Sequence, residues 1–301
     1  MIDKTYKKQI QLLLSVLPEV AKETTFALHG GTAINLFVRD MPRLSVDIDL
    51  TYLPIEDRST TLANIAAGLE RIKENLEKVL PGIRIQHKKE IGKLQISSNG
   101  VSVKLEANLV IRGTLTIPQK MILCSKAQSE FEAFCAINTV PYGQLYGGKI
   151  CAALDRQHPR DLFDIKYFLA NGGFNDEIKE GFFLCLLSSD RPIHEVISPN
   201  FQDQRLALVN QFTGMSNELF SYEEYEQVRL MLVNAVHKSI TAKDKEFLLS
   251  VKNLTPNWNT YDFERFPAIG WKLQNLQKLK DTNPQKYKKQ FENLKEKLDG
   301  L

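Results

Sequence analysis

The chain has 301 residues, of which 43% are hydrophobic and 25% charged, and its formal net charge is +3. This composition is that of an ordinary globular protein and excludes the disordered, collagenous and coiled-coil classes. No stretch approaches the roughly 18 uninterrupted apolar residues that a membrane helix needs. The first apolar segment lies between Asp3 and Pro18-Glu19 and lacks a cleavage pattern, so it predicts an amphipathic helix and not a signal peptide.

Apolar spacing of three and four residues predicts the helices, and short apolar or alternating runs predict the strands. The expected elements are a helix at 5–20, a strand at 24–29, a helix at 32–38, a strand at 43–53, a helix at 59–80, strands at 83–87, 92–98, 101–110, 120–125 and 134–140, and helices at 143–156, 160–170 and 176–189. The remainder is mainly helical. The pattern predicts an α+β fold with an α-helical second half.

The four cysteines form no C-x-x-C pair and have no histidine at metal-ligand spacing. They are Cys124, Cys135, Cys151 and Cys185. We expect buried thiols in a reducing cytoplasm and no zinc site.

Two aspartates alternate with apolar residues in the strand predicted at 43–53. A period of two sends Asp47 and Asp49 to the face opposite Ile48. Such a pair either forms salt bridges with nearby bases, for which Arg39 and Arg43 are available, or binds a divalent metal through hard oxygen ligands. For an isolated D-x-D pattern the structural interpretation is favoured.

Glu106 has the same polarity on the strand predicted at 101–110, together with Lys104 and Asn108. If the two strands are neighbours, Glu106 is a third carboxylate on the polar face, as a metal ligand or as a general base. Taken alone, it is a solvated strand residue.

Gly30-Gly31-Thr32 lies between the strand at 24–29 and the helix at 32–38. A flexible turn, a hydroxyl and a helix N-terminus are the parts of a phosphate-binding loop. The same residues also make an ordinary strand-to-helix connection.

The segment Gly143–Ile150 fits the P-loop pattern G-x-x-x-x-G-K except at Ile150, where Ser or Thr would hold Mg²⁺. The favoured interpretation places Lys149 and Arg156 on one stripe of a helix, with Asp161 and Asp164 one turn apart on the next helix. A lysine and an arginine on one helix suit triphosphate binding. They also suit a salt-bridge network with the two aspartates.

The segments LHGGTAINL, RLSVDIDL, VKLEANL, GGKICAALDR and RDLFDI, in this order, resemble the AbiEii/AbiGii-type toxin nucleotidyltransferases of the DNA polymerase beta-like superfamily. The resemblance covers about residues 26–169. It implies a mixed-sheet nucleotidyltransferase core over 1–140 and a helical domain over 141–301 that contributes Lys149, Asp161 and Asp164 to the site.

The resemblance also implies roles for single residues. Triphosphate contacts fall to the Gly30-Gly31-Thr32 turn and to Lys149, and Mg²⁺ ligands to Asp47 and Asp49. Two positions depart from the family pattern. Thr32 stands where many relatives have Ser, and Glu106 stands where the superfamily commonly has Asp.

The implied activity is Mg²⁺-dependent transfer of NMP from an NTP to an acceptor hydroxyl, with two metals at the site. The implied biological role is that of a toxin in a toxin–antitoxin or abortive-infection phage-defence pair, with tRNA or another RNA as acceptor and a separately encoded antitoxin as partner. Two alternatives stay open: a non-catalytic nucleotide- or RNA-binding module, and a P-loop-like NTPase.

The C-terminal segment from Trp271 to Leu301 has a local charge excess of about +4, because eight lysines outnumber four acidic residues. Such an excess attracts phosphate and gives modest support to an RNA acceptor. A solvated helix face is the favoured interpretation of the same residues.

Overall fold

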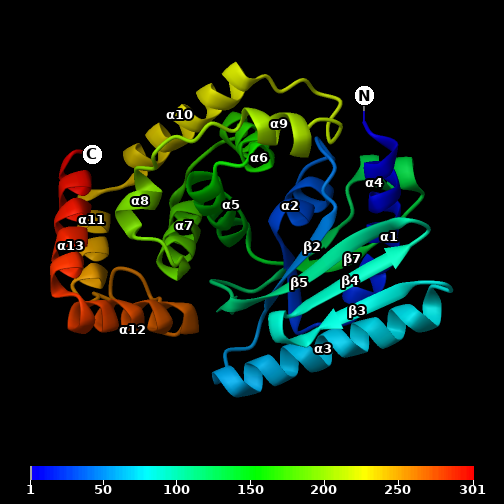
Figure 1. Ribbon diagram of the computed structural model, residues 1–301, viewed down its shortest axis with the longest axis horizontal. Coiled ribbons are helices and arrows are strands. Elements are labelled where there is room, and N and C mark those ends of the chain that lie inside the picture. The colour runs from blue at the N-terminus through cyan, green and yellow to red at the C-terminus, as the bar shows by residue number, and fades with distance from the viewer. Residues whose placement is uncertain (1) are drawn as a thin grey trace. The chain divides into compact units, whose positions relative to one another are not determined.

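A computed structural model describes residues 2–301 of the chain (Figure 1). The chain forms two compact units. The sheet unit consists of Met1–Pro141 and Phe212–Leu219, and the helical unit consists of Tyr142–Gln211 and Phe220–Leu301. Within residues 2–301, no helix is both long enough and apolar enough to cross a membrane.

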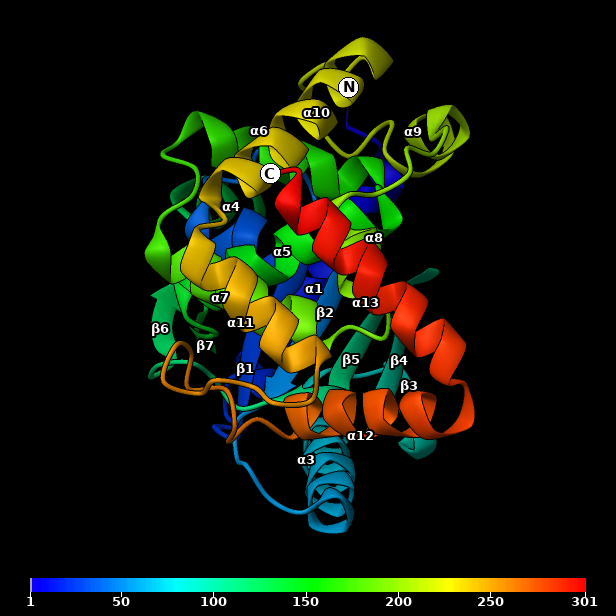
Figure 2. The same ribbon diagram turned by 90° about the vertical axis from the view of Figure 1, so that its left-hand side faces the viewer.

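The sheet unit is built on seven strands in the order β3-β4-β5-β2-β1-β7-β6 (Figure 2). β2 pairs parallel with β5 and β1 pairs parallel with β7, whereas the other pairs are antiparallel. The strands are β1 Phe26–His29, β2 Asp47–Tyr52, β3 Arg84–Lys88, β4 Lys93–Ser98, β5 Val101–Arg112, β6 Gln119–Ile122 and β7 Ala136–Thr139. The sheet is therefore mixed, and β2 lies at its centre.

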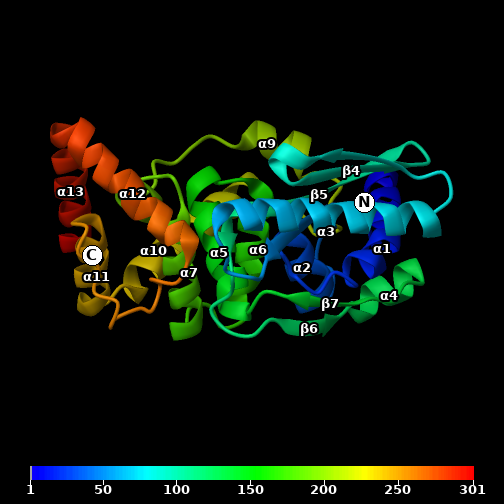
Figure 3. The same cartoon turned by 90° about the horizontal axis from the view of Figure 1, so that it is seen from below.

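Two long helices, α1 and α3, contact each other and the β3–β5 side of this sheet (Figure 3). Both begin at an aspartate cap, because Asp3 accepts a hydrogen bond from the Thr5 amide and Asp57 accepts one from the Thr60 amide. The helical segments of the sheet unit are α1 Lys4–Val20, α2 Gly30–Ala33, η1 Ile34–Val38, α3 Arg58–Val79, η2 Lys89–Ile91 and α4 Ser125–Phe131.

The helical unit is organised around α5 and α7, and α13 packs on α11 and α12 near the C-terminus (Figure 2). Its helices are α5 Tyr142–Arg156, α6 Pro159–Ala170, α7 Asp176–Ser188, α8 Ile193–Ile197, α9 Arg205–Gln211, α10 Tyr222–Ser239, α11 Ala242–Lys252, α12 Pro267–Thr282 and α13 Pro284–Asp299. Aromatic contacts such as Tyr146 stacked on Phe168, with ring centroids 4.9 Å apart, fill the space between α5 and α6.

The α+β fold with a helical second half is confirmed, but several boundaries differ from the prediction. β2 begins only at Asp47, the helix after β1 begins at Gly30, and α4 was not predicted at all. Asn99 and Gly100 both have positive φ, 49° and 77°, as a tight Asn-Gly hairpin turn between β4 and β5 requires. The thiols of Cys135, Cys151 and Cys185 are buried as expected, whereas Cys124 is only half-buried.

The segment Phe212–Leu219 returns to the sheet unit although it lies far along the chain. Hydrogen bonds attach it there, from the amides of Ile2, Asp3 and Leu44 and from the Ser216 hydroxyl. The Leu44 amide donates to the Met215 carbonyl at 2.7 Å, and the Ser216 hydroxyl donates to the Pro42 carbonyl at 2.9 Å. This contact supports the loop that leads into β2.

Candidate active site

The D-x-D pattern lies on β2 as predicted, with both aspartates on one face. Ile48 and Leu50 are completely buried on the other face, whereas Asp47 and Asp49 are half-buried. In the parallel pairing of β2 with β5, Asp49 lies opposite Glu106 and Asp47 lies opposite Lys104. The two strands are therefore neighbours, and the three carboxylates share the polar face of the sheet.

Lysines separate these carboxylates. Lys104 Nζ lies 3.3 Å from Glu106 Oε2 and 3.8 Å from Asp47 Oδ1, and Lys93 Nζ lies 3.0 Å from Glu106 Oε1. Partial burial would raise the pKa of Glu106, but the hydrogen bond from Lys93 and the charge of Lys104 outweigh it and lower that pKa. Glu106 is thus held ionised by two lysines.

Lys104 is a member of the site that the sequence analysis did not select. Its partial burial lowers the pKa of its ammonium group, yet the charges of Asp47 and Glu106 outweigh burial and raise it. The period of two along the strand had already placed Lys104 beside Glu106 on the polar face. This alternation is the sequence signal by which Lys104 could have been identified as a site residue.

The glycine turn is in direct contact with the D-x-D strand. Gly30 has a φ of +72°, and a Cβ at this position would lie 2.5 Å from Asp49 Oδ2. The Thr32 hydroxyl donates a hydrogen bond to the Asp47 carbonyl and lies 3.1 Å from Ser45 Oγ. Thr32 is fully buried, and its hydroxyl fixes the turn to β2.

Gly31 faces two further polar side chains that were not predicted as site residues. A Cβ at Gly31 would lie 2.8 Å from Ser45 Oγ and 2.9 Å from Arg43 Nη2. Arg43 is only 3% exposed, and its Nη1 donates to the Leu44 carbonyl at 2.9 Å. A buried guanidinium beside a glycine backbone supplies positive charge and N–H donors. Both residues precede β2 in the alternating run, but they lie outside the strand.

The donor set at β2 suits a hard divalent cation in part. Asp47 and Asp49 offer half-buried carboxylate oxygens on one face, the chemistry that Mg²⁺ prefers. Glu106 is instead bound by Lys93 and Lys104. Across residues 2–301, no group of three or more His, Cys, Asp or Glu side chains is gathered as a metal site. The two aspartates therefore fit the predicted metal better than Glu106 does.

A second polar cluster lies within the helical unit, between α5 and α6. Lys149 Nζ lies 2.8 Å from Asp161 Oδ1 and 2.9 Å from Asp164 Oδ2, and Arg156 Nε lies 2.6 Å from Asp161 Oδ2. Burial opposes ionisation of Asp161, but the charges of Lys149 and Arg156 outweigh it and hold its pKa well below the ordinary range. The salt-bridge network expected from the spacing is therefore present.

The P-loop interpretation is wrong, because Lys149 lies inside the continuous helix α5. The glycines of this segment serve helix packing instead. A Cβ at Gly143 or Gly147 would collide with the backbone of α7 at Glu177 and at Gly181. The glycines let α5 and α7 approach backbone to backbone, which a side chain would prevent.

The C-terminal lysines divide into two groups. Seven are exposed: Lys278, Lys280, Lys286, Lys288, Lys289, Lys295 and Lys297. Lys272 alone among the eight is buried, with 8% of its surface exposed. The exposed group matches the solvated-face interpretation, and Lys272 requires a separate explanation.

The family model for the nucleotidyl transferase AbiEii toxin of type IV toxin–antitoxin systems matches residues 11–275. The chain belongs to the AbiEii nucleotidyltransferase toxin family. It is thus a nucleotidyltransferase of the toxin class, which favours the enzyme over the non-catalytic binding module. A comparison with curated proteins found no match.

Among solved structures, the chain is similar to MenT4, a nucleotidyltransferase toxin from Mycobacterium tuberculosis H37Rv. The TM-score is 0.62 at 11% sequence identity, and the match covers 90% of this chain and 93% of MenT4. At so low an identity the similarity shows the fold alone. The mixed-sheet nucleotidyltransferase fold predicted for the chain is confirmed by this match.

Proposed function

We propose that this AbiEii-family enzyme transfers NMP from an NTP to a hydroxyl group of an RNA, with tRNA as the expected acceptor, and releases pyrophosphate. The observation that carries the proposal is the contact between the glycine turn and the D-x-D strand at Gly30 and Asp49. Their juxtaposition supports a triphosphate-binding backbone next to two carboxylates. Toxicity, a separately encoded antitoxin, phage defence and action in the cytoplasm belong to the same proposal.

Asp47 and Asp49 would hold Mg²⁺, for which two ions are expected. When bound, the metal neutralises charge that develops on the transferred phosphoryl group. Gly30, Gly31 and Thr32 would keep the backbone close to the triphosphate, and the buried Arg43 guanidinium adds positive charge beside Gly31. The charge of Lys104 helps to keep Glu106 ionised.

Glu106 would act as metal ligand or as the base that accepts the proton of the attacking hydroxyl. Its lowered pKa favours the ionised form that either role needs. The ionic cluster of Lys149, Arg156, Asp161 and Asp164 is proposed to take part in nucleotide binding, in line with the family order of motifs. Lys149 would then act with its ammonium already oriented by two carboxylates.

The experiment compares α-³²P-labelled with γ-³²P-labelled NTP in the presence of Mg²⁺ and total RNA. NMP transfer predicts that the α-label enters RNA while the γ-label appears in pyrophosphate. Entry of the γ-label into RNA or protein would indicate a kinase reaction and would reject the proposal. Absence of transfer from all four NTPs to total RNA or purified tRNA would reject it as well.

A further inference from the structure

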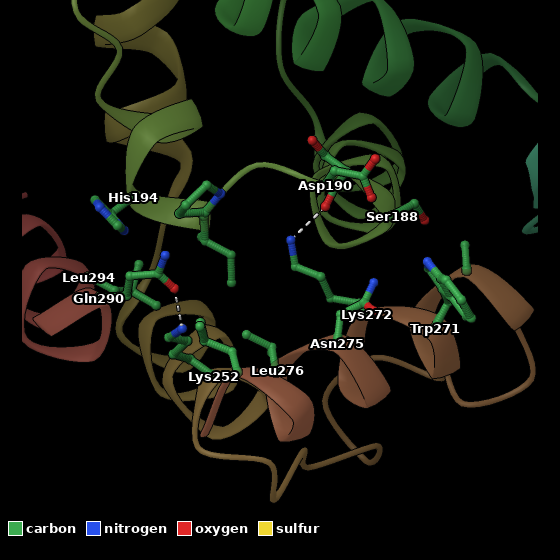
Figure 4. Close-up of a pocket in the computed structure, with 15 residues that line it drawn as sticks. Ser188, Asp190, His194, Lys252, Trp271, Lys272, Asn275, Leu276, Gln290 and Leu294 are labelled. Carbon is green, nitrogen blue, oxygen red and sulfur yellow. Dashed lines mark hydrogen bonds between the residues drawn. The ribbon is translucent and has the colours of Figure 1, made fainter. Parts of the chain in front are cut away.

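The helical unit contains a cavity of about 130 Å³ whose lining includes none of the residues of the nucleotidyltransferase motifs (Figure 4). It is lined by the loop between α7 and α8, the end of α11, and α12 and α13. Six lining residues matter for its chemistry: Asp190, His194, Lys252, Trp271, Lys272 and Gln290. Four of the six can carry a charge, and two of these are buried lysines.

The two lysines are held by neutral partners. Lys252 is 4% exposed, and its Nζ donates to Gln290 Oε1 at 2.9 Å and lies 4.7 Å from the centroid of the Tyr287 ring. Lys272 is 8% exposed, and its Nζ donates to the carbonyls of Ser189 at 2.5 Å and Arg191 at 2.8 Å. Figure 4 shows the Lys272 side chain crossing toward the loop at Asp190.

Neither ammonium forms an ion pair with a carboxylate anywhere in residues 2–301. Buried charges in proteins are normally paired or bound to an ion, because leaving them unpaired is costly. Burial lowers the pKa of each lysine to about 8, and the charge of Lys272 lowers that of Lys252 further. Both still carry their charge at neutral pH, and the cavity therefore concentrates positive charge.

The surrounding groups do not cancel this charge. Asp190 is exposed and forms no ion pair with Lys272 in the described residues, and its charge only partly offsets the burial that lowers the pKa of that lysine. His194 adds no compensating negative charge. An ammonium group has three donors, so these hydrogen bonds leave two N–H groups on Lys252 and one on Lys272 for a ligand.

We propose that this cavity is a phosphate-binding site in which Lys252 and Lys272 supply the charge and Trp271 supplies a stacking surface for an adjacent base. The cavity is far smaller than the roughly 300–1,000 Å³ of pockets that enclose a drug-sized ligand, so it accommodates one phosphate group and leaves the base outside. Trp271 lines the cavity and is 48% exposed, as an aromatic ring needs to be for stacking on a base. The phosphate belongs to a free nucleotide or to an RNA strand.

Fluorescence of Trp271 in the full-length protein tests this inference. The chain has two tryptophans, so a Trp258→Phe background leaves Trp271 as the only reporter. Titrations in EDTA, which weakens metal-dependent triphosphate binding elsewhere, use inorganic phosphate, AMP and a single-stranded RNA oligonucleotide. We expect saturable changes with all three probes and at least about fivefold tighter binding of AMP than of phosphate, since one stacked base contributes at least about 1 kcal/mol.

Variants then assign the contacts. The double change Lys252→Met and Lys272→Met should weaken binding of all three probes at least tenfold. The matched control is Lys278→Met, which removes an exposed lysine from helix α12, the helix of Lys272. This change should leave the affinity for each probe within twofold of its value without the change. Tighter binding of the oligonucleotide than of AMP would identify an RNA strand as the source of the phosphate. Equal affinities for the oligonucleotide and AMP would identify a free nucleotide.

A Trp271 signal that responds to none of the probes overturns the proposal, and so does a response that the double variant retains. If the double variant fails to fold, the comparison of AMP with inorganic phosphate on the Trp258→Phe protein still decides. Equal affinities would then reject the stacking role, and no saturation would reject the site. Because this readout does not use NMP transfer, it can fail or succeed independently of the proposed function.

Discussion

The backbone of Gly30 faces the carboxylate of Asp49 so closely that a single added Cβ would lie 2.5 Å from Asp49 Oδ2. The glycine also has a φ of +72°, a conformation that residues with a side chain rarely adopt. Gly30 therefore lets the turn lie directly against the D-x-D strand, because it has no side chain and tolerates a left-handed backbone conformation.

Replacing Gly30 by alanine should displace Asp49 and abolish most of the NMP transfer, with a loss of about 100-fold or more, as expected when a catalytic group is misplaced by about 1 Å. Gly82→Ala is the matched control, because Gly82 has a φ of +78° but nothing within 4 Å of its would-be Cβ. It carries the same backbone strain without the clash. Equal activities of the two variants, measured by label transfer and corrected for folded fraction, would contradict the role assigned to the contact.

Lys104→Met should move the acid limb of the activity profile to higher pH. Lys104 lowers the pKa of Glu106, so its removal should raise that pKa. A larger fraction of Glu106 is then protonated at a given acidic pH. Measurement of kcat/KM between about pH 5 and 9 checks this, with the exposed Lys88→Met on β3 as control. An unchanged acid limb in the Lys104 variant would show that ionisation of Glu106 does not limit the reaction.

Asp161→Asn should destabilise the helical unit by about 3 kcal/mol, because it leaves buried charge on Lys149 without one of its partners. Asp155→Asn is the control, since its pair with Arg191 is exposed and such pairs contribute less than about 1 kcal/mol. Denaturant unfolding of both variants at neutral pH measures the difference.

The ion pair between Lys149 and Asp161 also predicts that the stability of the protein depends on pH. The folded pKa of Asp161 lies below its unfolded value of about 3.9. Its stabilising effect is therefore complete above that value and is lost as the pH falls through the folded pKa. The difference in the free energy of unfolding between wild type and Asp161→Asn should become smaller below pH ~4. A difference that stays constant down to pH ~2 would contradict the lowered pKa of Asp161 in the folded protein.

Gly147→Ala should destabilise the protein by several kcal/mol, because its Cβ would collide with the backbone of Gly181 and Phe182 on α7. Gly148→Ala is its neighbour on the same helix and meets only Cys185 Sγ, at an ordinary contact distance of 3.5 Å. That change should be neutral or stabilise by up to about 1 kcal/mol, because alanine favours the helix. Thermal unfolding distinguishes the two variants, and similar midpoints would reject backbone-to-backbone packing.

Much of the sheet unit was predictable because its signals are local. Alternation along Asp47–Tyr52 gives the facing of the two aspartates, and helical spacing gives α1 and α3. The position of Glu106 beside Asp49 needed the strand order, which no local pattern encodes. From the sequence alone, Glu106 could therefore be named as a site residue only on the condition that the two strands are neighbours.

The failures have physical reasons as well. The glycines of Gly143–Ile150 satisfy the same pattern whether they wrap a phosphate or admit a neighbouring helix, and only the partner α7 decides. Arg43 and Ser45 lie before the strand and reach the site because of a loop held by Phe212–Leu219. The buried Lys272 could not be told from exposed lysines, since burial of one residue depends on tertiary packing.

The most direct test of the central proposal is the rate of α-label transfer to RNA by Asp49→Asn, measured beside Glu90→Gln, which alters an exposed carboxylate of the same unit. If Asp49 holds the catalytic metal, its variant should lose about 100- to 1,000-fold in rate while keeping its fold, and the Glu90 variant should match the wild type. Transfer by Asp49→Asn at the wild-type rate would contradict the account.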